Sequence, residues 1–394
     1  MEALIARTPQ TFREKQNIDA RTLHEVEEID LDRRRVRVRQ IENGSVGWES
    51  FDHLLIATGA SPVFPDVPGA NAQGVYGLGT LQSGIEVRKA IDQDTPRRAV
   101  IIGGGYIGLE MAEALVLRGL EVSLVERLPQ VMGTLDADMG ALVSDALRHI
   151  GVALHLEESL ESFDVDRGHV RAVVTDQRTL PADLVILGLG VRPNSTLAGE
   201  AEIPLSASGA IKVNERMQTA VEGVWAAGDC VESFHLVSRK PFYVALGTVA
   251  NKQGRVAGIN LGGSYATFPG VVGTAVSKVC AVEVARTGLQ ESDIQHLGWE
   301  YITAKIDSKT RAGYYPDAGP ITVKVLAEKN SGRLLGGQIV GIEGAAKRID
   351  VLATALHAGF TVQEMIHLDL SYAPPYSPVW DPVLIAARRA ADLV

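Results

Sequence analysis

Cysteine is almost absent from this sequence, since only two of its 394 residues are cysteines. So few thiols exclude a disulfide framework, and we expect a reducing, cytoplasmic setting. Long apolar runs are missing too: none reaches the roughly 18 residues that a membrane helix needs, and the first ten residues hold no apolar signal core. The formal net charge is −10, whereas a nucleic-acid surface needs a basic face to neutralise phosphates. We therefore expect neither a membrane nor a nucleic acid as partner.

The middle of the chain alternates short apolar strands with helices, and the length allows two or three domains. Strands are predicted over 98–102, 121–125 and 183–187, and helices over 103–118 and 136–150. Such alternation with short connections predicts a parallel sheet wound by right-handed crossovers. This part of the chain is therefore expected to be an α/β domain.

The two ends of the chain have a different texture. Before the middle part, the pattern predicts a helix over 3–16, two strands within 22–40 and a strand over 53–56. Pro62, Pro65 and Pro68 then predict a linker. After the middle part, a helix is predicted over 243–261, strands over 273–284, 321–326 and 334–340, and a final helix over 345–358. The last 130 or so residues thus predict a separate α+β domain.

The strongest motif is the glycine triplet Gly103-x-Gly105-x-x-Gly108, which follows a predicted strand and opens a predicted helix. In this context Gly103 makes the turn, Gly105 lets the backbone approach a pyrophosphate, and Gly108 lets helix and strand pack closely. The helix N-terminus adds partial positive charge for the phosphates. The triplet predicts a dinucleotide site.

An acidic residue, Glu126, stands at the end of the next predicted strand. A carboxylate there accepts hydrogen bonds from the adenine ribose hydroxyls and repels a 2′-phosphate, which favours NADH over NADPH. Arg127 follows directly and could tolerate a phosphate, so NADPH stays possible. No metal site is predicted.

A second signal is Asp229 in the run Trp225-Ala226-Ala227-Gly228-Asp229. A carboxylate held at a strand end beside a glycine can hydrogen-bond the ribitol or ribose hydroxyls of a flavin. The run is common by itself, and it gains weight from its order after Ala57-Thr58-Gly59 and the glycine triplet.

The series ATG, GGGYIGLE, GLGVRPN (which contains Gly190) and AAGD resembles the FAD-dependent pyridine nucleotide-disulfide oxidoreductases. Three further segments resemble the coenzyme A-disulfide reductase and NADH oxidase branch of that family: VALGTVANKQGRVAGIN over 244–260, GAAKRIDV over 344–351 and YAPPYSPVWDP over 372–382. The resemblance runs from about residue 4 to about residue 389, nearly the whole chain.

The resemblance implies an α/β fold with two Rossmann-like dinucleotide-binding domains and an α+β C-terminal dimerisation domain. The expected divisions are a remnant of the FAD-binding domain (1–69), the NAD(P)H-binding domain (70–194), the second part of the FAD-binding domain (195–264) and the dimerisation domain (265–394). The cofactors implied are FAD and NADH, and the assembly implied is a homodimer.

The resemblance also implies a reaction and its residues. NADH passes hydride to FAD, and reduced FAD reduces a single redox-active cysteine that cycles with coenzyme A disulfide, or with peroxide or oxygen. Tyr372 looks like the family's tyrosine beside flavin and cysteine, and Tyr314 or Tyr315 looks like its second tyrosine. A phenol can donate a proton to a departing thiolate; the alternative is an interface aromatic. Lys15 matches a family position that contacts coenzyme A phosphates, although an exposed lysine is more often only solvated.

The sequence departs from the family at its amino end. Neither the flavin fingerprint nor the Ser-Phe-x-x-Cys nucleophile segment is found before Ala57, so we expect an N-terminally truncated FAD domain. Either the chain is a fragment of an ordinary enzyme, or it is a short protein without disulfide chemistry. Cys230 follows Asp229 and could lie near the cofactor, while Cys280, in the predicted strand 273–284, is expected to be a small core residue.

We therefore predict an NADH-dependent flavoprotein reductase of a small disulfide, with coenzyme A disulfide first. An NADH oxidase or peroxidase of the same family, with oxygen or peroxide as acceptor, is the first alternative. A non-catalytic NADH-binding dimer is the second. A cysteine-independent ferredoxin or rubredoxin reductase would explain the missing nucleophile but not the YAPPYSP segment.

Overall fold

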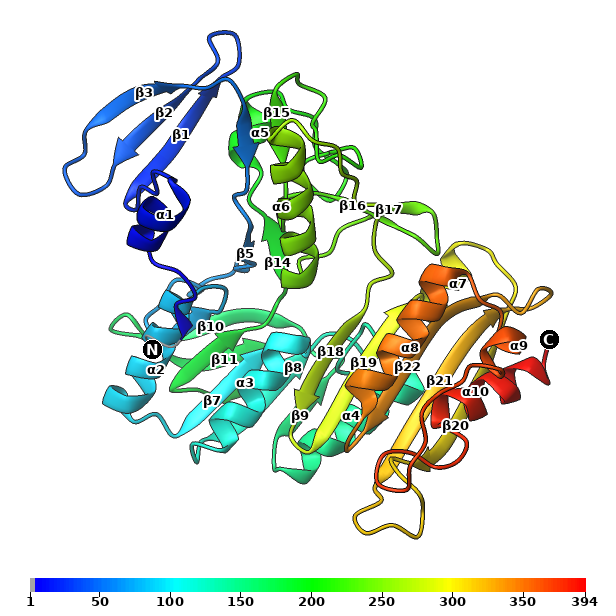
Figure 1. The fold of residues 1–394 in the computed structure, drawn as a ribbon. Coiled ribbons are helices and arrows are strands. Elements are labelled where there is room, and N and C mark those ends of the chain that lie inside the picture. Colours follow the sequence, from blue (N-terminus) through cyan, green and yellow to red (C-terminus); the bar gives the residue numbers. More distant parts are fainter. Residues whose placement is uncertain (1–3) are drawn as a thin grey trace. The chain divides into compact units, whose positions relative to one another are not determined.

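The structure is a computed structural model that describes residues 4–394, and Figure 1 gives its element labels. The chain divides into two compact units, each built from separate stretches of sequence. The first unit comprises Met1–Gly59, Pro193–Glu232 and Tyr243–Phe268; the second comprises Ala60–Arg192, Ser233–Phe242 and Pro269–Val394. Each unit has its own hydrophobic core.

The first unit begins with helix α1 (Pro9–Gln16) and an antiparallel meander of β1 (His24–Asp30), β2 (Arg35–Gln40) and β3 (Val46–Ser50). Helix α1 starts at Pro9 because Thr8 is its N-cap, accepting a hydrogen bond from the Thr11 amide. The helix is therefore shorter than predicted, and Ala3, its predicted first residue, lies outside the described residues. The predicted strands within 22–40 are confirmed as β1 and β2.

The same unit contains a short parallel pair, β4 (Leu54–Ile56) with β15 (Val224–Ala226), and the helices α5 (Thr196–Glu200) and α6 (Gly247–Leu261). The inner face of this pair is fully apolar: Ile56, Val224 and Ala226 are buried together with Ile29 of β1. On the other face, Val256 and Ala257 of α6 pack on Trp225. The two strands thus lie between a helix and a meander, with their carboxyl ends side by side.

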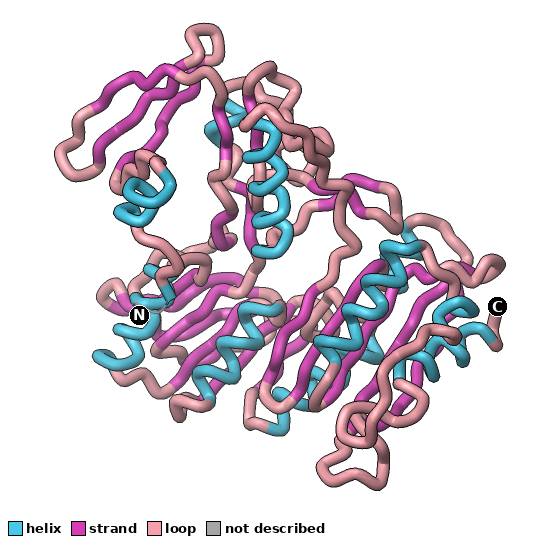
Figure 2. The backbone as a smooth tube through the Cα atoms, in the orientation of Figure 1, coloured by secondary structure: helices cyan, strands magenta, loops and turns pink. Residues whose placement is uncertain are grey.

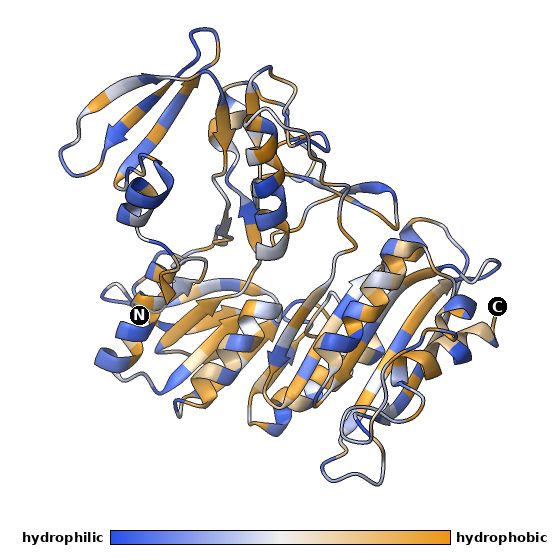
Figure 3. Ribbon diagram, viewed as in Figure 1, coloured by the Kyte–Doolittle hydropathy of each residue, from blue (hydrophilic) through white to orange (hydrophobic). Residues whose placement is uncertain are grey.

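The second unit opens with a five-stranded parallel sheet in the order β6-β13-β7-β8-β9. Its strands are β6 (Val75–Gly77), β7 (Arg98–Ile102), β8 (Glu121–Glu126), β9 (Ala153–Leu156) and β13 (Leu184–Leu187), and its helices are α2 (Leu81–Asp94), α3 (Tyr106–Val116) and α4 (Ala137–His149). The central strands are buried on both faces, as continuous apolar runs in parallel sheets are. The predicted parallel α/β sheet is confirmed, and Figure 3 shows its apolar strands.

Several short strands of this unit have no counterpart in the prediction. They form an antiparallel sheet of β10 (Leu160–Asp166), β11 (His169–Thr175) and β12 (Thr179–Pro181), and two pairs, β5 (Ala60–Pro62) with β14 (Val191–Pro193) and β16 (Ser233–His235) with β17 (Lys240–Phe242). Strand β5 reaches Pro62, where the predicted linker begins.

The carboxyl-terminal part of the second unit is a five-stranded antiparallel sheet in the order β18-β19-β22-β21-β20. Figure 2 draws strands in magenta and the helices beside them in cyan. Its strands are β18 (Ala275–Val279), β19 (Val282–Gly288), β20 (Tyr301–Lys309), β21 (Pro320–Glu328) and β22 (Leu334–Gly341), and its helices are α7 (Glu291–His296), α8 (Ala345–Ala358), α9 (Val362–Met365) and α10 (Pro382–Ala391). Helix α8 covers β19 and β22, and α10 covers β20 and β21. The predicted α+β character of this region is confirmed.

Two predictions fail here. The single strand over 273–284 is a hairpin, because Cys280 turns the chain with φ +57 between β18 and β19. Cys280 is therefore a half-buried turn residue and not a strand residue. Helix α8 is also not the final helix, because α10 follows, with Asp381 as its N-cap and Pro382 at its first position.

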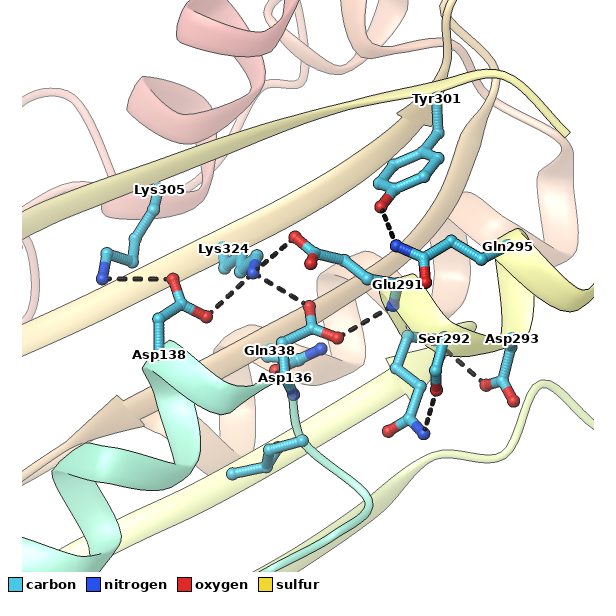
Figure 4. A network of polar contacts seen from close by, with 12 residues as sticks. Asp136, Asp138, Glu291, Ser292, Asp293, Gln295, Tyr301, Lys305, Lys324 and Gln338 are labelled. Atoms are coloured by element: carbon cyan, nitrogen blue, oxygen red, sulfur yellow. Dashed lines mark hydrogen bonds and ion pairs between the residues drawn. The ribbon is translucent and has the colours of Figure 1, made fainter. Parts of the chain in front are cut away.

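The parallel and antiparallel sheets of the second unit are joined by buried polar contacts (Figure 4). Lys324 of β21, whose side chain is 5% exposed, lies 3.0 Å from Asp136, 2.8 Å from Asp138 and 2.8 Å from Glu291. The Asp136 amide donates to Oε1 of Gln338 over 2.9 Å, and Oδ1 of Asp136 accepts from the Glu291 amide over 2.8 Å. We call these five residues the Lys324 cluster; it fixes the start of α4 to the antiparallel sheet.

A second contact uses the β18–β19 hairpin. Ser277 donates to Glu110 over 2.9 Å, and the Cys280 amide donates to Glu113 over 2.8 Å; both glutamates belong to α3. Val279 and Val284 pack into the core that α3 shares with the parallel sheet. No helix within residues 4–394 is both long and apolar enough to cross a membrane.

Candidate functional site

The glycine turn after β7 has the geometry that a dinucleotide pyrophosphate requires. Gly103 has φ +100, and a Cβ there would lie 2.5 Å from the carbonyl oxygen of Gly188 at the end of β13. A Cβ on Gly108 would overlap the carbonyl oxygen of Gly103, so α3 rests directly on the turn. Both positions are therefore restricted to glycine, the first by backbone conformation and the second by helix–strand packing.

Gly105 plays a different part because the space beside it is open. The nearest atom to a Cβ there would be the Gly188 carbonyl oxygen at 4.0 Å. Gly105 is the N-cap of α3, and no side chain of residues 4–394 caps this helix end. Free backbone N–H groups beside open space form an anion site at the positive end of the helix dipole.

Glu126 lies over the same turn. Its Oε2 accepts from the Gly104 amide over 2.7 Å, and its Oε1 accepts from the Leu128 amide over 2.9 Å. These bonds hold the carboxylate at the end of β8 while each oxygen keeps a lone pair for a ribose hydroxyl. Gly190, with φ +84 and open space beside it, follows the end of β13 in the same sheet.

Replacing Glu126 by glutamine is expected to shift the preference between the two nicotinamide cofactors. The amide removes the charge that repels a 2′-phosphate and weakens the bonds to ribose, because hydrogen bonds to charged groups contribute about 1.5–3 kcal/mol. We expect the ratio of NADH to NADPH affinity, measured by calorimetry, to fall at least about tenfold. Exposed Arg127 supplies the matched control, since Arg127→Gln should weaken NADPH alone. An unchanged ratio in the Glu126 variant would place the ribose elsewhere.

In the first unit, the predicted flavin residues gather at the carboxyl ends of β4 and β15. Oγ1 of Thr58 donates to the Asn194 carbonyl, and the Asn194 side chain returns a bond to the Thr58 carbonyl over 2.9 Å. Gly59 accepts from the Asn194 amide over 2.9 Å. Gly228 has φ +87, and its amide donates to Gln253 of α6 over 2.9 Å. Neighbouring parallel strands end at the same edge, so these residues form one surface.

Asp229 stands on this surface with unused bonding capacity. Its Oδ1 is buried and has no hydrogen-bond partner among residues 4–394, and burial raises the pKa of its carboxyl group. An orphaned buried acceptor is costly unless a donor fills it. A ribityl or ribose hydroxyl is such a donor, so the residues present fit a flavin. The Tyr243 hydroxyl donates to the Asp229 backbone carbonyl over 2.9 Å, and burial raises the pKa of Tyr243 to about 12.

Asn194, Gln253 and Tyr243 were not predicted as site residues. Asn194 closes the GLGVRPN segment, and Gln253 lies inside VALGTVANKQGRVAGIN. A polar residue that is 1% exposed on an amphipathic helix, as Gln253 is, needs a partner. The motif could therefore have flagged Gln253, whereas the contacts of Asn194 and Tyr243 depend on tertiary structure.

The structure argues against either cysteine as a thiolate nucleophile. Cys230 is fully buried, with its Sγ facing the carbonyl oxygens of Ile56 at 3.6 Å and Ala227 at 3.4 Å. Burial, together with nearby Glu113, raises the pKa of Cys280 to about 11. Reactive cysteines are accessible and ionise readily, whereas Cys230 is buried and the pKa of Cys280 is raised.

The predicted tyrosines lie in the carboxyl-terminal part of the second unit. Tyr314 (78% exposed) and Tyr372 (44% exposed) come from different loops, and their hydroxyls are hydrogen-bonded, which raises the pKa of Tyr372. Tyr315 turns back on Ala312, whose carbonyl accepts from its amide over 2.8 Å. Lys15 is exposed in the last turn of α1 and makes no hydrogen bond or ion pair with another described residue.

Family models match both parts of this arrangement. Residues 2–254 match the pyridine nucleotide-disulphide oxidoreductase model, and residues 274–382 match the dimerisation domain of the same family. The chain belongs to the pyridine nucleotide-disulphide oxidoreductases, which use FAD and NAD(P)H.

Its relatives carry several related names. The chain is 39% identical over 389 residues to the NAD(P)H sulfur oxidoreductase (CoA-dependent) of Pyrococcus furiosus, covering 98% of this chain and 86% of the relative. It is 30% identical to the coenzyme A disulfide reductase of Staphylococcus haemolyticus, with 98% and 86% covered. The solved NAD-dependent persulfide reductase from A. fulgidus matches with a TM-score of 0.95 at 40% identity, covering 98% of this chain and 72% of that one.

Proposed function

We propose that this chain is an NADH-dependent flavoprotein reductase of a small disulfide, with coenzyme A disulfide as the first candidate. The observation that carries the proposal is that the loops of two exposed tyrosines, Tyr314 and Tyr372, meet through the Ala312 amide, which donates to the Pro374 carbonyl over 3.2 Å, and that the two phenols interact. It occurs in a chain that also has a dinucleotide turn and an orphaned carboxylate suited to a flavin. Relatives that are named for coenzyme A disulfide or persulfide reduction support this substrate class.

In the proposal, the second unit binds NADH. The N-terminus of α3 at Gly105 takes the pyrophosphate, Glu126 takes the adenine ribose, and Gly190 leaves room beside the cofactor. In the first unit, Thr58, Gly59, Gly228 and Asp229 hold the flavin, with Asp229 accepting from a hydroxyl. We keep the expected domain divisions at 1–69, 70–194, 195–264 and 265–394 as part of the proposal.

FAD, when bound, supplies a two-electron carrier between NADH and the acceptor. Overall, NADH, one proton and the disulfide give NAD⁺ and two thiols, so the two electrons of the hydride break the S–S bond. We assign Tyr314 and Tyr372 to proton delivery: one phenol donates to a departing thiolate sulfur and regains its proton from water. Tyr315 is the alternative partner of Tyr372. Lys15 is the candidate for coenzyme A phosphates.

A second candidate follows from the two cysteines. Because Cys230 is buried and the pKa of Cys280 is raised, neither of them suits thiol–disulfide exchange. An acceptor that needs no thiolate is oxygen: NADH, a proton and O₂ give NAD⁺ and hydrogen peroxide. The NADH oxidase of Methanocaldococcus jannaschii, 35% identical over 98% of this chain, supports this candidate.

The test is anaerobic NADH titration of the purified full chain, followed by acceptor. We expect flavin absorbance that bleaches with NADH and returns when coenzyme A disulfide is added, with one NAD⁺ formed for two thiols. If the flavin absorbance returns only after air is admitted, the oxidase is favoured. A protein that binds NADH without flavin absorbance would overturn the enzyme proposal in favour of an NADH-binding dimer.

A further inference from the structure

One buried cation in the carboxyl-terminal part of the chain has contacts that the proposed reaction does not use. Arg348, in the second turn of α8, is 8% exposed and inserts its guanidinium between two loops. Its Nε donates to Oδ2 of Asp381 over 2.9 Å, and its Nη2 donates to the carbonyl oxygens of Thr310 at 2.9 Å and Tyr376 at 3.2 Å. Its Nη1 reaches the Gly344 carbonyl at 3.5 Å.

The first loop joins β20 to β21 and contains Tyr314. Its ends are closed at Thr310, whose amide donates to the Gly319 carbonyl over 2.9 Å and whose hydroxyl accepts from the Gly319 amide over 3.2 Å. The Thr310 carbonyl, which these two bonds leave free, accepts from Arg348. The guanidinium therefore fixes the base of the loop on which Tyr314 is exposed.

The second loop precedes α10 and contains Tyr372. Besides the Tyr376 carbonyl, Arg348 holds Asp381, which is the N-cap of α10 and also accepts from the Ser377 hydroxyl over 3.1 Å. The two loops then meet at two places: the Ala312 amide donates to the Pro374 carbonyl over 3.2 Å, and the phenols of Tyr314 and Tyr372 are bonded. Arg348 is thus the shared support of the two loops.

We propose that Arg348 is a positioning residue that holds Tyr314 and Tyr372 at hydrogen-bonding distance for the reaction. This inference rests on the role of the two tyrosines in the proposed function. A planar guanidinium can serve a carboxylate and several carbonyls at fixed angles, which a lysine ammonium cannot. The phenols themselves are exposed, so their own bond in water cannot hold two loops together against the entropy of loop motion.

The test compares four full-length variants, and combinations of them named with each readout, with the parent protein. Arg348→Lys keeps the positive charge and removes the planar fork. Arg348→Met/Asp381→Asn removes both charges and so leaves no buried carboxylate unpaired. This double variant keeps the inference testable if Arg348→Lys does not fold. Lys347→Met is the matched control, because Lys347 precedes Arg348 on α8 and its side chain is 90% exposed. Tyr314→Phe/Tyr372→Phe removes the phenols.

The first readout is the ionisation of Tyr372. It is measured as the change of ultraviolet absorbance with pH in each protein, minus the same change in the Tyr372→Phe derivative of that protein. We expect Arg348→Lys and the charge-free double variant to ionise Tyr372 at lower pH than the parent and to exchange amide hydrogens faster over 310–319 and 369–381. Lys347→Met should match the parent. Unchanged ionisation and exchange in the folded Arg348 variants would overturn the inference.

The second readout is turnover of NADH with coenzyme A disulfide. We expect both Arg348 variants to lower kcat about 10- to 100-fold with the KM for NADH unchanged, as displaced catalytic groups do. Adding Arg348→Lys to the phenylalanine double variant should then lower kcat no further. If the phenols separate but the phenylalanine double variant retains full turnover, the positioning role stands and the tyrosines' part in the proposed function is overturned.

Discussion

Replacing Lys324 by methionine is expected to destabilise the second unit by about 3–5 kcal/mol, because a buried charge network that loses one partner leaves the others uncompensated. Three carboxylates lie within 3.0 Å of the Lys324 ammonium, and the Asp136 side chain is only 4% exposed. Methionine has a similar volume, so a cavity does not contribute to the expected loss. Urea and thermal unfolding of the two proteins measure it.

The matched control is Lys305→Met. Lys305 also pairs with a member of the Lys324 cluster, Asp138, over 3.1 Å. The side chain of Lys305, however, is 41% exposed. Exposed pairs contribute about 0–1 kcal/mol. Equal losses in the two variants would mean that the Lys324 cluster does not join the two sheets.

The loss caused by Lys324→Met should also depend on pH. In the parent, burial lowers the pKa of Lys324, but the three carboxylates outweigh burial and raise it. The contribution of Lys324 to the free energy of unfolding therefore persists up to alkaline pH and is lost only as pH rises through the raised pKa. Burial raises the pKa of Asp136, whereas Lys324 and Lys305 outweigh burial and lower that of Asp138. Asp138 therefore contributes stability above its ordinary pKa and loses it as pH falls through the lowered value. In the variant, protonation relieves the carboxylates, so the difference between variant and parent should shrink as pH falls toward about 4.

Substituting alanine at Gly108 is expected to abolish NADH binding and to loosen the parallel sheet, because its Cβ would overlap the Gly103 carbonyl oxygen and push α3 away from the turn. The backbone of Gly103 cannot yield, since its own position against Gly188 is already close. We expect an NADH Kd at least about 100-fold higher, as overpacking costs about 1–3 kcal/mol and the helix end also loses its alignment with the pyrophosphate. Calorimetric titration and thermal unfolding measure both effects.

The Gly105→Ala substitution distinguishes an effect on NADH binding from an effect on helix packing. The space beside Gly105 is open, so the variant should fold with the parent's stability and still lose NADH affinity, because the methyl group occupies the place of a phosphate oxygen. An NADH affinity equal to the parent's in the Gly105 variant would show that the pyrophosphate does not lie over this helix end.

The parallel sheet was predictable because its signals are local. Strands β7 and β13 are largely continuous apolar runs, and the glycine triplet and Glu126 have fixed spacings. The turn at Cys280 was not predictable, because no glycine, proline or asparagine marks it and a non-glycine residue carries the positive φ. Helix α10 was missed although Asp381-Pro382 is a helix-start signal, since it directly follows a segment dominated by prolines and aromatics.

The polar networks could be predicted least. The Lys324 cluster brings together residues near 136, 291, 324 and 338, which are far apart in the sequence. No sequence pattern predicts which acidic residue pairs with a given lysine. The one signal is Lys324 itself, a charge between the apolar residues Val323 and Val325 in the buried part of β21, which requires a buried partner. The same holds for Arg348, whose partners are mostly backbone carbonyls and leave no trace in side-chain patterns.

The division of the chain into interrupted units has a consequence for how the protein folds. The five strands of the parallel sheet all lie between residues 75 and 187, so this sheet can close while the rest of the chain is still being synthesised. In the first unit, by contrast, Leu54 pairs with Val224, and the covering helix α6 ends only at Leu261. Its strand β4 must therefore wait with an unpaired edge while the intervening residues emerge from the ribosome. That interval exposes the nascent chain to intermolecular strand pairing.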